Sequence, residues 1–432
     1  MAHTAEKLLQ MAAQKGEPRV VGRYREADGV VPGWHKWAAQ HSQKEDEIVI
    51  CRGRNEWRQA ACDDDDNDKH LSVVSWNILS NTWWEQGKKD GEYDHTHPEH
   101  GDWSFRFQRL LQWMEQLDPD VLAVQELDYV KFETDMLPEL QRRGYEGMMQ
   151  QPKKKAADQP CGNATFWKST IFQLVQQASF SRTLCTVLDM TEDKVGQVCI
   201  VNVHLESSQS DVGFDRRARQ MNSALAYAAS EAPGAALLVC GDCNTGADAE
   251  LFRVLREHEW HGHNFSSVYE HPSTHKTLPV SVATFICPGA HYVIDHMLYA
   301  QDCLRLRCAL DAFSPEEMDE HVHAKGDDCG FPSAFCPSDH VPIGAIFEIL
   351  PQQHKKSKAV AALSPEREEE LGRQWDALCS ERPPHTKGKP SPEELAARKK
   401  FAALVKAWKE TLKDNPLETE FVAKLTKKKG KK

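Results

Sequence analysis

Five short polar clusters in this 432-residue sequence stand at the ends of apolar segments, where an enzyme built on a sheet places its catalytic groups. They contain Asn77 in SWNIL, Glu126 in VLAVQELD, His204 in VCIVNVHLES, Asp242 and Asn244 in ALLVCGDCNTG, and Asp295 in YVIDHMLY with Asp339 and His340 in PSDHVPI. Considered separately, Asn77 is typical of a turn, Glu126 is typical of a strand end that reaches solvent, and His204 is typical of a histidine in the core. The interpretation therefore depends on the whole set.

Two of the clusters favour a functional role even when considered separately. Gly241 frees the backbone just before Asp242, and Asp339 stands directly beside His340 just before an apolar strand. An adjacent Asp-His pair in that position is difficult to explain as surface decoration.

The set as a whole supplies the groups that phosphoester hydrolysis needs. Glu126, with Asn77 and Asp339 as further candidates, offers oxygen ligands for a hard cation, which predicts Mg²⁺, with Mn²⁺ as its substitute, rather than zinc. The cation would neutralise phosphoryl charge, one carboxylate would align or deprotonate water, and histidines would stabilise the transition state.

The elements that must position these groups are buried strands alternating with helices. Strands are predicted at LSVVSW, VLAVQE, VCIVNVHL, ALLVCGD, YVIDHMLY and IGAIFEI. Apolar residues at helical spacing predict a helix over 107–117, and a second is expected over about 215–229. The pattern predicts a layered α/β catalytic domain over residues 71–350.

The two ends of the chain differ from this body. Residues 1–70 are predicted to be an N-terminal extension that closes with the acidic linker 63–66. Residues 351–432 are predicted to be a helical, basic extension, because Ser364-Pro365-Glu366 and Ser391-Pro392-Glu393 are typical helix starts. An apolar face over 401–412 follows in the second helix.

Charge is divided unevenly along the chain. The net charge is −12, but residues 351–432 carry 20 Lys and Arg against 12 Asp and Glu, which leaves 33 against 53 in residues 1–350. The acidic body would repel a polyanion, so the lysines at 424–432 are predicted to tether RNA. A nuclear-import signal, or docking of the 401–412 face on the body or on a protein partner, remain the alternatives.

Cysteine usage and the absence of a long apolar run bear on location. The 13 cysteines are odd in number and scattered through apolar segments, which predicts reduced thiols. Cys240 and Cys243 have CxxC spacing, for which zinc or redox chemistry is the minor alternative. Without an apolar run of membrane length or a signal-peptide core, a cytoplasmic location is expected, with the nucleus as the alternative.

The ordered set Asn, Glu, His, Asp-x-Asn, Asp, Asp-His resembles the endonuclease/exonuclease/phosphatase superfamily over about 270 residues, from Asn77 to His340. Its local sequence motifs are most similar to those of the carbon catabolite repressor/nocturnin/angel group of 3′ exoribonucleases. The shared segments are SWNIL, Trp103-Ser-Phe-Arg106, CGNATFW from Cys161, NVHLES, Arg217-x-x-Gln220 and PSDHVPIGAIFEI. The resemblance implies a four-layer α/β/β/α sandwich of the deoxyribonuclease I type.

The resemblance also implies a role for each residue of the set. Glu126 and Asn77 would bind Mg²⁺ with help from Asp339, His204 would contact the scissile phosphate, Asp242 and Asn244 would position water and phosphate, and Asp295 would orient His340. Two departures from the pattern of this group bear on substrate preference. Cys243 stands where the group often has an aromatic residue, and His296 where it usually has tyrosine.

Three functions are compatible with this sequence. The first is a Mg²⁺-dependent, deadenylase-like exoribonuclease that acts on single-stranded RNA, for which one or two of Trp83, Trp84, Tyr93, Trp103 and Phe105 would stack on bases. The second is a nocturnin-like phosphomonoesterase of a small nucleotide, such as a dinucleotide 2′-phosphate. The third is a catalytically silent scaffold, which the retention of every polar position disfavours.

Overall fold

The protein, studied as a computed structural model, consists of two compact units, residues 2–352 and 353–432. The structure describes residues 48–62, 70–152, 160–191, 196–247, 249–257, 259–260, 263–270, 278, 283–350, 365–381, 391–412 and 422. The predicted acidic linker, the lysines at 424–432 and most of the N-terminal extension lie outside the described residues.

Two large sheets form the centre of the first unit. The first has the strand order β1 (Val49–Arg52), β14 (Leu304–Asp311), β15 (Ile343–Ile349), β2 (His70–Asn77), β3 (Val121–Asp128), β5 (Cys161–Lys168) and β4 (Tyr145–Met149). The second has the order β10 (Phe265–Ser267), β13 (Asp295–Ala300), β9 (Ala236–Asp242), β8 (Gln197–His204), β7 (Thr183–Met190) and β6 (Phe172–Phe180). A small hairpin pairs β11 (Phe285–Cys287) with β12 (Ala290–Tyr292).

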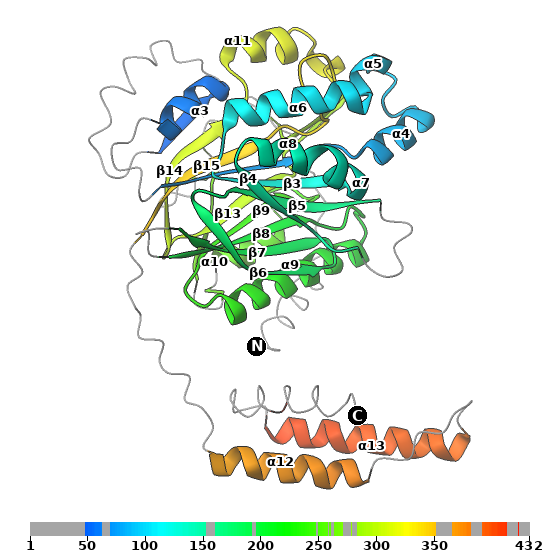
Figure 1. Ribbon diagram of the computed structural model, residues 1–432. Coiled ribbons are helices and arrows are strands. Elements are labelled where there is room, and N and C mark those ends of the chain that lie inside the picture. The colour runs from blue at the N-terminus through cyan, green and yellow to red at the C-terminus, as the bar shows by residue number, and fades with distance from the viewer. Residues whose placement is uncertain are drawn as a thin grey trace. The chain divides into compact units, whose positions relative to one another are not determined.

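Helices cover the outer faces of both sheets (Figure 1). The first sheet is packed by α3 (Gly53–Cys62), α6 (Trp103–Leu117) and α8 (Leu137–Arg142), and the second by α9 (Asp211–Glu231) and α10 (Glu250–Glu257). Shorter elements are α4 (Asn81–Asp90), α5 (Pro98–Gly101), α7 (Tyr129–Lys131), α11 (Pro315–Met318), the π-helical turns η2 (Phe132–Met136) and η3 (Asp319–His323), and the 3₁₀ turn η4 (Gly326–Asp328). The predicted four-layer α/β/β/α sandwich is confirmed.

Three apolar cores hold the layers together. One lies between the sheets and includes Val73, Ile200 and Leu238, and one lies under each helical layer, around Trp76 and around Leu225. Because strands such as β2 and β8 contribute to a core on each face, they read as continuous apolar runs in the sequence.

The predicted strands and helices match the structure closely, with small shifts. The helix expected over 107–117 is α6, and the helix expected over 215–229 is the longer α9. The strand predicted at YVIDHMLY starts only at Asp295, because Tyr292 belongs to β12. Residues 49–52 and 53–62, which the sequence analysis grouped with the N-terminal extension, form β1 and α3, and β1 pairs with β14 of the first sheet.

The described residues of the second unit include two helices. These are α12 (Pro365–Ser380) and α13 (Pro392–Thr411), which begin at the two predicted Ser-Pro positions. Trp375 and Trp408 stack at 5.7 Å between ring centroids, and the Trp408 indole nitrogen donates to Gln374. Part of the apolar face over 401–412 is therefore used to pack the two helices together.

Among the described residues, no helix is long and apolar enough to span a membrane.

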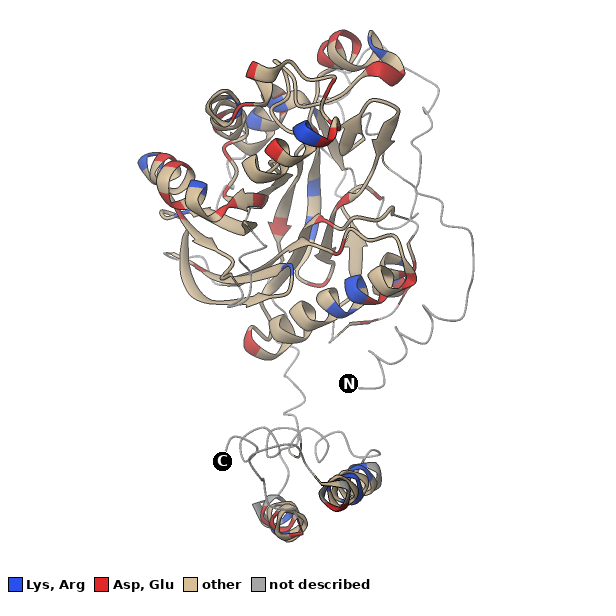
Figure 2. Ribbon diagram, turned by 90° about the vertical axis from the view of Figure 1, so that its right-hand side faces the viewer, with Lys and Arg blue, Asp and Glu red and all other residues tan. Residues whose placement is uncertain are grey.

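The described cysteines are free thiols, and most are buried. Cys240 packs between the sheets, whereas Cys243 packs in the core under α9 and α10. The two thiols therefore belong to different cores, and the CxxC spacing is not a metal or disulfide site. Acidic positions lie on strands inside the body as well as on the helices that cover it (Figure 2).

Candidate active site

The predicted site residues meet where the ends of both sheets come together. The strands β2 and β3 run parallel in the first sheet, and β8 and β9 run parallel in the second. Consequently Asn77, at the end of β2, shares an edge with Glu126, and His204 pairs in register with Asp242. Asp295 begins β13, which runs antiparallel to β9, and is also paired with Asp242. Asp339 and His340 come from the end of the connection between β14 and β15, so this connection completes the group that the strands gather.

Asn77 connects the two sheets. Its Nδ2 lies 3.2 Å from Glu126 Oε1, 3.1 Å from Asp242 Oδ2 and 3.4 Å from His340 Nε2. Its Oδ1 accepts from the Leu79 amide at 3.1 Å. In this orientation the amide nitrogen faces the cluster, so the predicted role of Asn77 as a metal ligand requires the amide to turn over.

Glu126 is aimed into the site by an irregularity in β3. The register of β3 on β5 shifts between Val124 and Leu127, and Glu126 has φ +59°, an uncommon value for a residue other than glycine. Its Oε2 accepts from the Ser80 amide at 3.1 Å. Burial and the charge of Asp339 raise the pKa of Glu126 above its ordinary 4.5. Backbone strain and an unfavourable charge at one residue are typical of a functional position.

The two histidines have opposite electrostatic environments. Burial disfavours the His340 imidazolium, but Asp295, whose Oδ2 lies 2.8 Å from Nδ1, together with Asp242 and Asp339, raises the pKa of His340 well above its ordinary value. Burial outweighs nearby carboxylates at His204 and lowers its pKa. The surrounding carboxylates therefore favour the protonated form of His340, whereas burial favours the neutral form of His204.

Among the acidic and imidazole groups of the cluster, His204 and Glu126 have the side chains that are most exposed to solvent. His204 Nε2 lies 3.6 Å from both Glu126 Oε1 and Asp242 Oδ2. The side chains of His204 and Glu126 each remain 14% exposed, whereas those of Asp242 and Asp295 are 3% exposed. A phosphate entering from solvent would therefore meet His204 and Glu126 first.

The turn after β9 positions Asp242 and Asn244. Gly241 has φ +137°, and a Cβ there would lie 2.0 Å from the Val203 carbonyl oxygen, so only glycine fits. Asp242 Oδ1 accepts from the Asn244 amide at 2.8 Å, and Asn244 Nδ2 donates to the Leu205 carbonyl. Burial and the charge of Asp295 raise the pKa of Asp242.

Asp339 is held by residues that the sequence analysis missed as site members. The Tyr93 hydroxyl donates to its Oδ2 at 2.8 Å, and Ser338 Oγ lies 3.3 Å from its Oδ1 while donating to the Asn77 carbonyl. The charge of Asp339 raises the pKa of Glu126. Ser338 adjoins the Asp-His pair and could have been suspected, whereas nothing in the sequence around Tyr93 marked its role.

A second supporting layer orients the loops beside the site. Arg217 Nη1 donates to the carbonyls of Glu206 and Ser208, and Gln220 Oε1 accepts from the Glu206 amide. These bonds fix the loop that follows His204. The Arg217-x-x-Gln220 motif is therefore a positioning device for the end of β8.

The aromatic residues proposed as stacking platforms are mostly packing residues. Trp84, Tyr93 and Trp103 are buried, whereas Trp83 is 40% exposed. A different aromatic residue reaches the site: the ring of Phe285, on β11, packs edge-on against His340 with 5.1 Å between centroids. Phe285 could not be predicted from periodicity, because β11 is only three residues long.

The side chains of Cys243 and His296, the two departures from the family pattern, point away from the cluster. Cys243 is buried in the core under α9, and the ring of His296 packs on Phe252 and lies 2.8 Å from the Thr245 carbonyl oxygen. Alternate residues of a strand face opposite sides, so Asp295 faces the site and His296 does not. Neither departure changes the groups that face the cluster.

The charge of the site fits a divalent cation. Four carboxylates converge, from Glu126, Asp242, Asp295 and Asp339, and within the described chain no Lys or Arg forms an ion pair with any of them. The imidazoles of His204 and His340, together with the buried Arg106 guanidinium, which interacts with Asp339 and Glu126 without an ion pair, offset this charge only in part. Carboxylate oxygens with uncompensated charge are the donor set that hard divalent cations take.

Comparison with known proteins agrees with this arrangement. The family model of the Endonuclease/Exonuclease/phosphatase family matches residues 74–340. Protein angel homolog 2 of Homo sapiens is 25% identical over 268 residues, 57% of this chain and 47% of the relative. The CCR4-Not complex 3'-5'-exoribonuclease subunit Ccr4 of Candida albicans is 24% identical over 321 residues, 60% of this chain and 39% of the relative. The chain thus spans half or less of the length of these relatives.

The solved structures show the same fold. The crystal structure of ANGEL2, a 2',3'-cyclic phosphatase, in complex with adenosine-2',3'-vanadate superposes with a TM-score of 0.53 at 20% identity, covering 65% of this chain and 96% of that one. These matches fall in the carbon catabolite repressor, nocturnin and angel group, as the sequence motifs indicated. The chain belongs to the Endonuclease/Exonuclease/phosphatase family.

Proposed function

We propose that this protein is a Mg²⁺-dependent phosphodiesterase that removes nucleotides from the 3′ end of single-stranded RNA. The observation that carries the proposal is the convergence of Glu126, Asp242 and His204 around the Asn77 amide, beside a buried Asp295–His340 pair. We assign this activity to a catalytic domain over residues 71–350, with residues 351–432 as a helical extension.

The metal would be held by oxygen ligands. Glu126 is the principal ligand in this proposal, with Asp339 and the oxygen of Asn77 completing the set. When bound, the cation neutralises charge on the phosphoryl oxygens. Mg²⁺ is preferred because the ligand set is oxygen only. Tyr93, by donating to Asp339, would hold that carboxylate in place.

The remaining groups have distinct tasks on the phosphate. Asp242 would accept the proton of the attacking water, a task for which a raised pKa suits a carboxylate. The amide of Asn244 fixes the orientation of Asp242. The His340 imidazolium, held by Asp295, would stabilise the extra negative charge of the transition state. Neutral His204 would donate a hydrogen bond to a phosphoryl oxygen.

The choice of RNA rests on relatives rather than on the site. The Ccr4 relative is named as a 3'-5'-exoribonuclease, and the ANGEL2 structure is described as a 2',3'-cyclic phosphatase. A 3'-5'-exoribonuclease acts at the 3′ end of RNA, and a 2′,3′-cyclic phosphate is a group that the 3′-terminal ribose of RNA can carry. A terminal cyclic phosphatase is therefore the second candidate, and a small-nucleotide phosphomonoesterase is the third.

One experiment separates these functions. The full chain is incubated with 5′-labelled RNA ending in a 3′-hydroxyl, the same RNA ending in a 2′,3′-cyclic phosphate, matched DNA, and a dinucleotide 2′-phosphate, each with Mg²⁺ or with chelator. A ladder of shortened RNA that forms only with Mg²⁺ supports the exoribonuclease. Opening of the cyclic phosphate without shortening of the RNA would instead identify a cyclic phosphatase. Release of free phosphate from the dinucleotide would instead identify a phosphomonoesterase. No reaction in any arm would favour a scaffold.

A further inference from the structure

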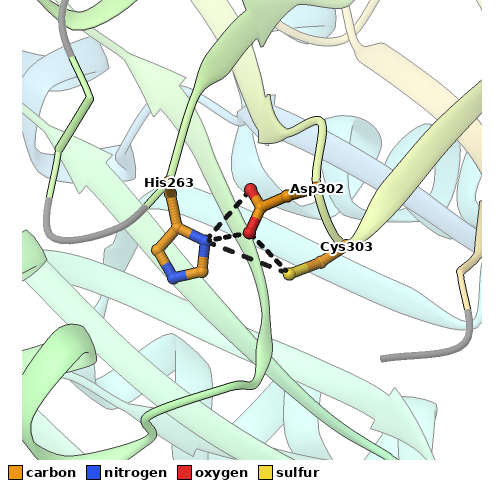
Figure 3. A group of neighbouring side chains, drawn as sticks. All are labelled: His263, Asp302 and Cys303. Carbon is orange, nitrogen blue, oxygen red and sulfur yellow. Dashed lines mark hydrogen bonds and ion pairs between the residues drawn. The ribbon is translucent and has the colours of Figure 1, made fainter. Parts of the chain in front are cut away.

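A second cluster of metal-ligating side chains lies in the first unit, outside the active site. His263 precedes β10, and Asp302 and Cys303 lie in the turn that joins β13 of the second sheet to β14 of the first. Figure 3 shows the three side chains pointing toward one another, with the Nδ1 side of the imidazole facing the carboxylate and the sulfur. Residues distant in sequence thus converge at one point.

The distances within the cluster match those of a tetrahedral metal site. His263 Nδ1 lies 3.1 Å from Asp302 Oδ2 and 3.9 Å from Cys303 Sγ, and Cys303 Sγ lies 3.5 Å from Asp302 Oδ2. Zinc at its usual bond lengths would place tetrahedral ligands about 3.3 Å apart for N and O, about 3.6 Å for N and S, and about 3.5 Å for O and S. Each pair is therefore within about 0.3 Å of the spacing required.

We propose that His263, Asp302 and Cys303 bind a zinc ion, with His263 Nδ1, an Asp302 oxygen and the Cys303 thiolate as three of four tetrahedral ligands. One thiolate, one imidazole and one carboxylate form a mixed set that suits a borderline cation such as Zn²⁺ and does not suit Mg²⁺. The Cys303 residue is buried, and the side chains of His263 and Asp302 are 12% and 27% exposed, so an ion would enter from the Asp302 side.

The position of this cluster indicates a structural role. Asp295 and Ala300 stand at opposite ends of β13, about 17 Å apart at about 3.3 Å per residue, so the cluster lies far from the phosphoester site. The Gln301 amide donates to the Asn264 carbonyl, and the Leu350 amide donates to the Cys303 carbonyl. A zinc ion would therefore tie the segment before β10 to the turn that links the two sheets.

The simpler explanation is a hydrogen-bonded group without metal, in which the thiol and the imidazole both contact Asp302. Cobalt(II) distinguishes the two, because a cobalt–thiolate bond gives a charge-transfer absorption in the near ultraviolet. The full chain is stripped with chelator, dialysed and titrated with CoCl₂. We expect this absorption to saturate at one equivalent in the wild type, to disappear in Cys303→Ser, and to persist in Cys379→Ser, a control thiol on α12.

The melting temperature provides an independent measurement that also shows whether each variant folds. Zinc chloride should raise it in the wild type and in Glu126→Gln, and should raise it less in His263→Gln and in Asp302→Asn, because a ligand bound only by the native state stabilises that state. The proposal is overturned if the wild type shows no cobalt–thiolate absorption, if Cys303→Ser retains it, or if zinc raises the melting temperature of Asp302→Asn as much as that of the wild type.

Discussion

Replacing Asp295 by Asn should disable His340 without removing it. Asp295 Oδ2 lies 2.8 Å from His340 Nδ1, and both side chains are almost fully buried. Two unit charges about 4 Å apart attract by about 4 kcal/mol at an effective dielectric constant of about 20. If the imidazolium is needed in the transition state, losing this attraction lowers kcat by up to about 1000-fold.

The pairing also makes two qualitative predictions. Because each residue acts through the other, Asp295→Asn and His340→Ala should each cost nearly as much as the double variant. Asp295 is also a main cause of the raised pKa of His340. Its neutral replacement should therefore move the alkaline decline of activity to lower pH.

The assay is single-turnover hydrolysis of a short labelled RNA at saturating Mg²⁺, with the pH profile recorded for each variant. A matched control exists at the other end of β13, where Asp302 contacts His263 at 3.1 Å. Asp302→Asn breaks the same kind of pair and should leave kcat unchanged. Losses for Asp295→Asn and His340→Ala that simply multiply in the double variant would refute the pairing, as would a normal pH profile for Asp295→Asn.

Three further changes test the surroundings of the site. In metal-free protein, Glu126 of the native state binds its proton more tightly than the unfolded chain does, so the stability that this residue contributes is lost as pH rises above 4.5. Glu126→Gln should therefore melt at a higher temperature than wild type at pH 7 in chelator. A lower melting temperature of the variant would contradict this. Tyr93→Phe releases Asp339 and should raise the Mg²⁺ concentration for half-maximal activity about 10- to 100-fold, whereas Tyr145→Phe, far from the site, should not. Asn202→Ala removes the hydrogen bonds to the Val124 and Ala164 carbonyls between the sheets, and should lower the free energy of unfolding by about 2–4 kcal/mol. Urea titration measures this loss. A loss below about 0.5 kcal/mol would mean that water replaces the amide.

The buried central strands could be predicted from the sequence because they are apolar on both faces. The strands β2, β3, β8 and β9 lie between a helical core and the inter-sheet core, so their residues form unbroken apolar runs. An edge strand lacks this signal. In β6, FQLVQQASF keeps most residues partly exposed, and its polar side chains interrupt the apolar pattern that would predict a strand.

The residues of the site could be predicted from the sequence because each stands next to or within an apolar segment, as Glu126 does at the end of one and His340 just before another. The fine geometry of the site could not be predicted. The shift in register that turns Glu126 into the cluster depends on how β3 pairs with β5, about 35 residues later in the chain, and no local pattern encodes it. Tyr93 contacts Asp339 across 246 residues, and His263 meets Cys303 across 40, so only the folded chain reveals either contact.

The central claim is that the Glu126 cluster is a metal-dependent phosphoesterase site. The most direct test is the rate of hydrolysis of single-stranded RNA by wild type and by Glu126→Gln, each with Mg²⁺ and with chelator, after circular dichroism has shown that both are folded. We predict turnover only for wild type with Mg²⁺, and a loss of at least about 100-fold in the variant. Equal rates for the two proteins, or wild-type turnover that persists in chelator, would contradict the account.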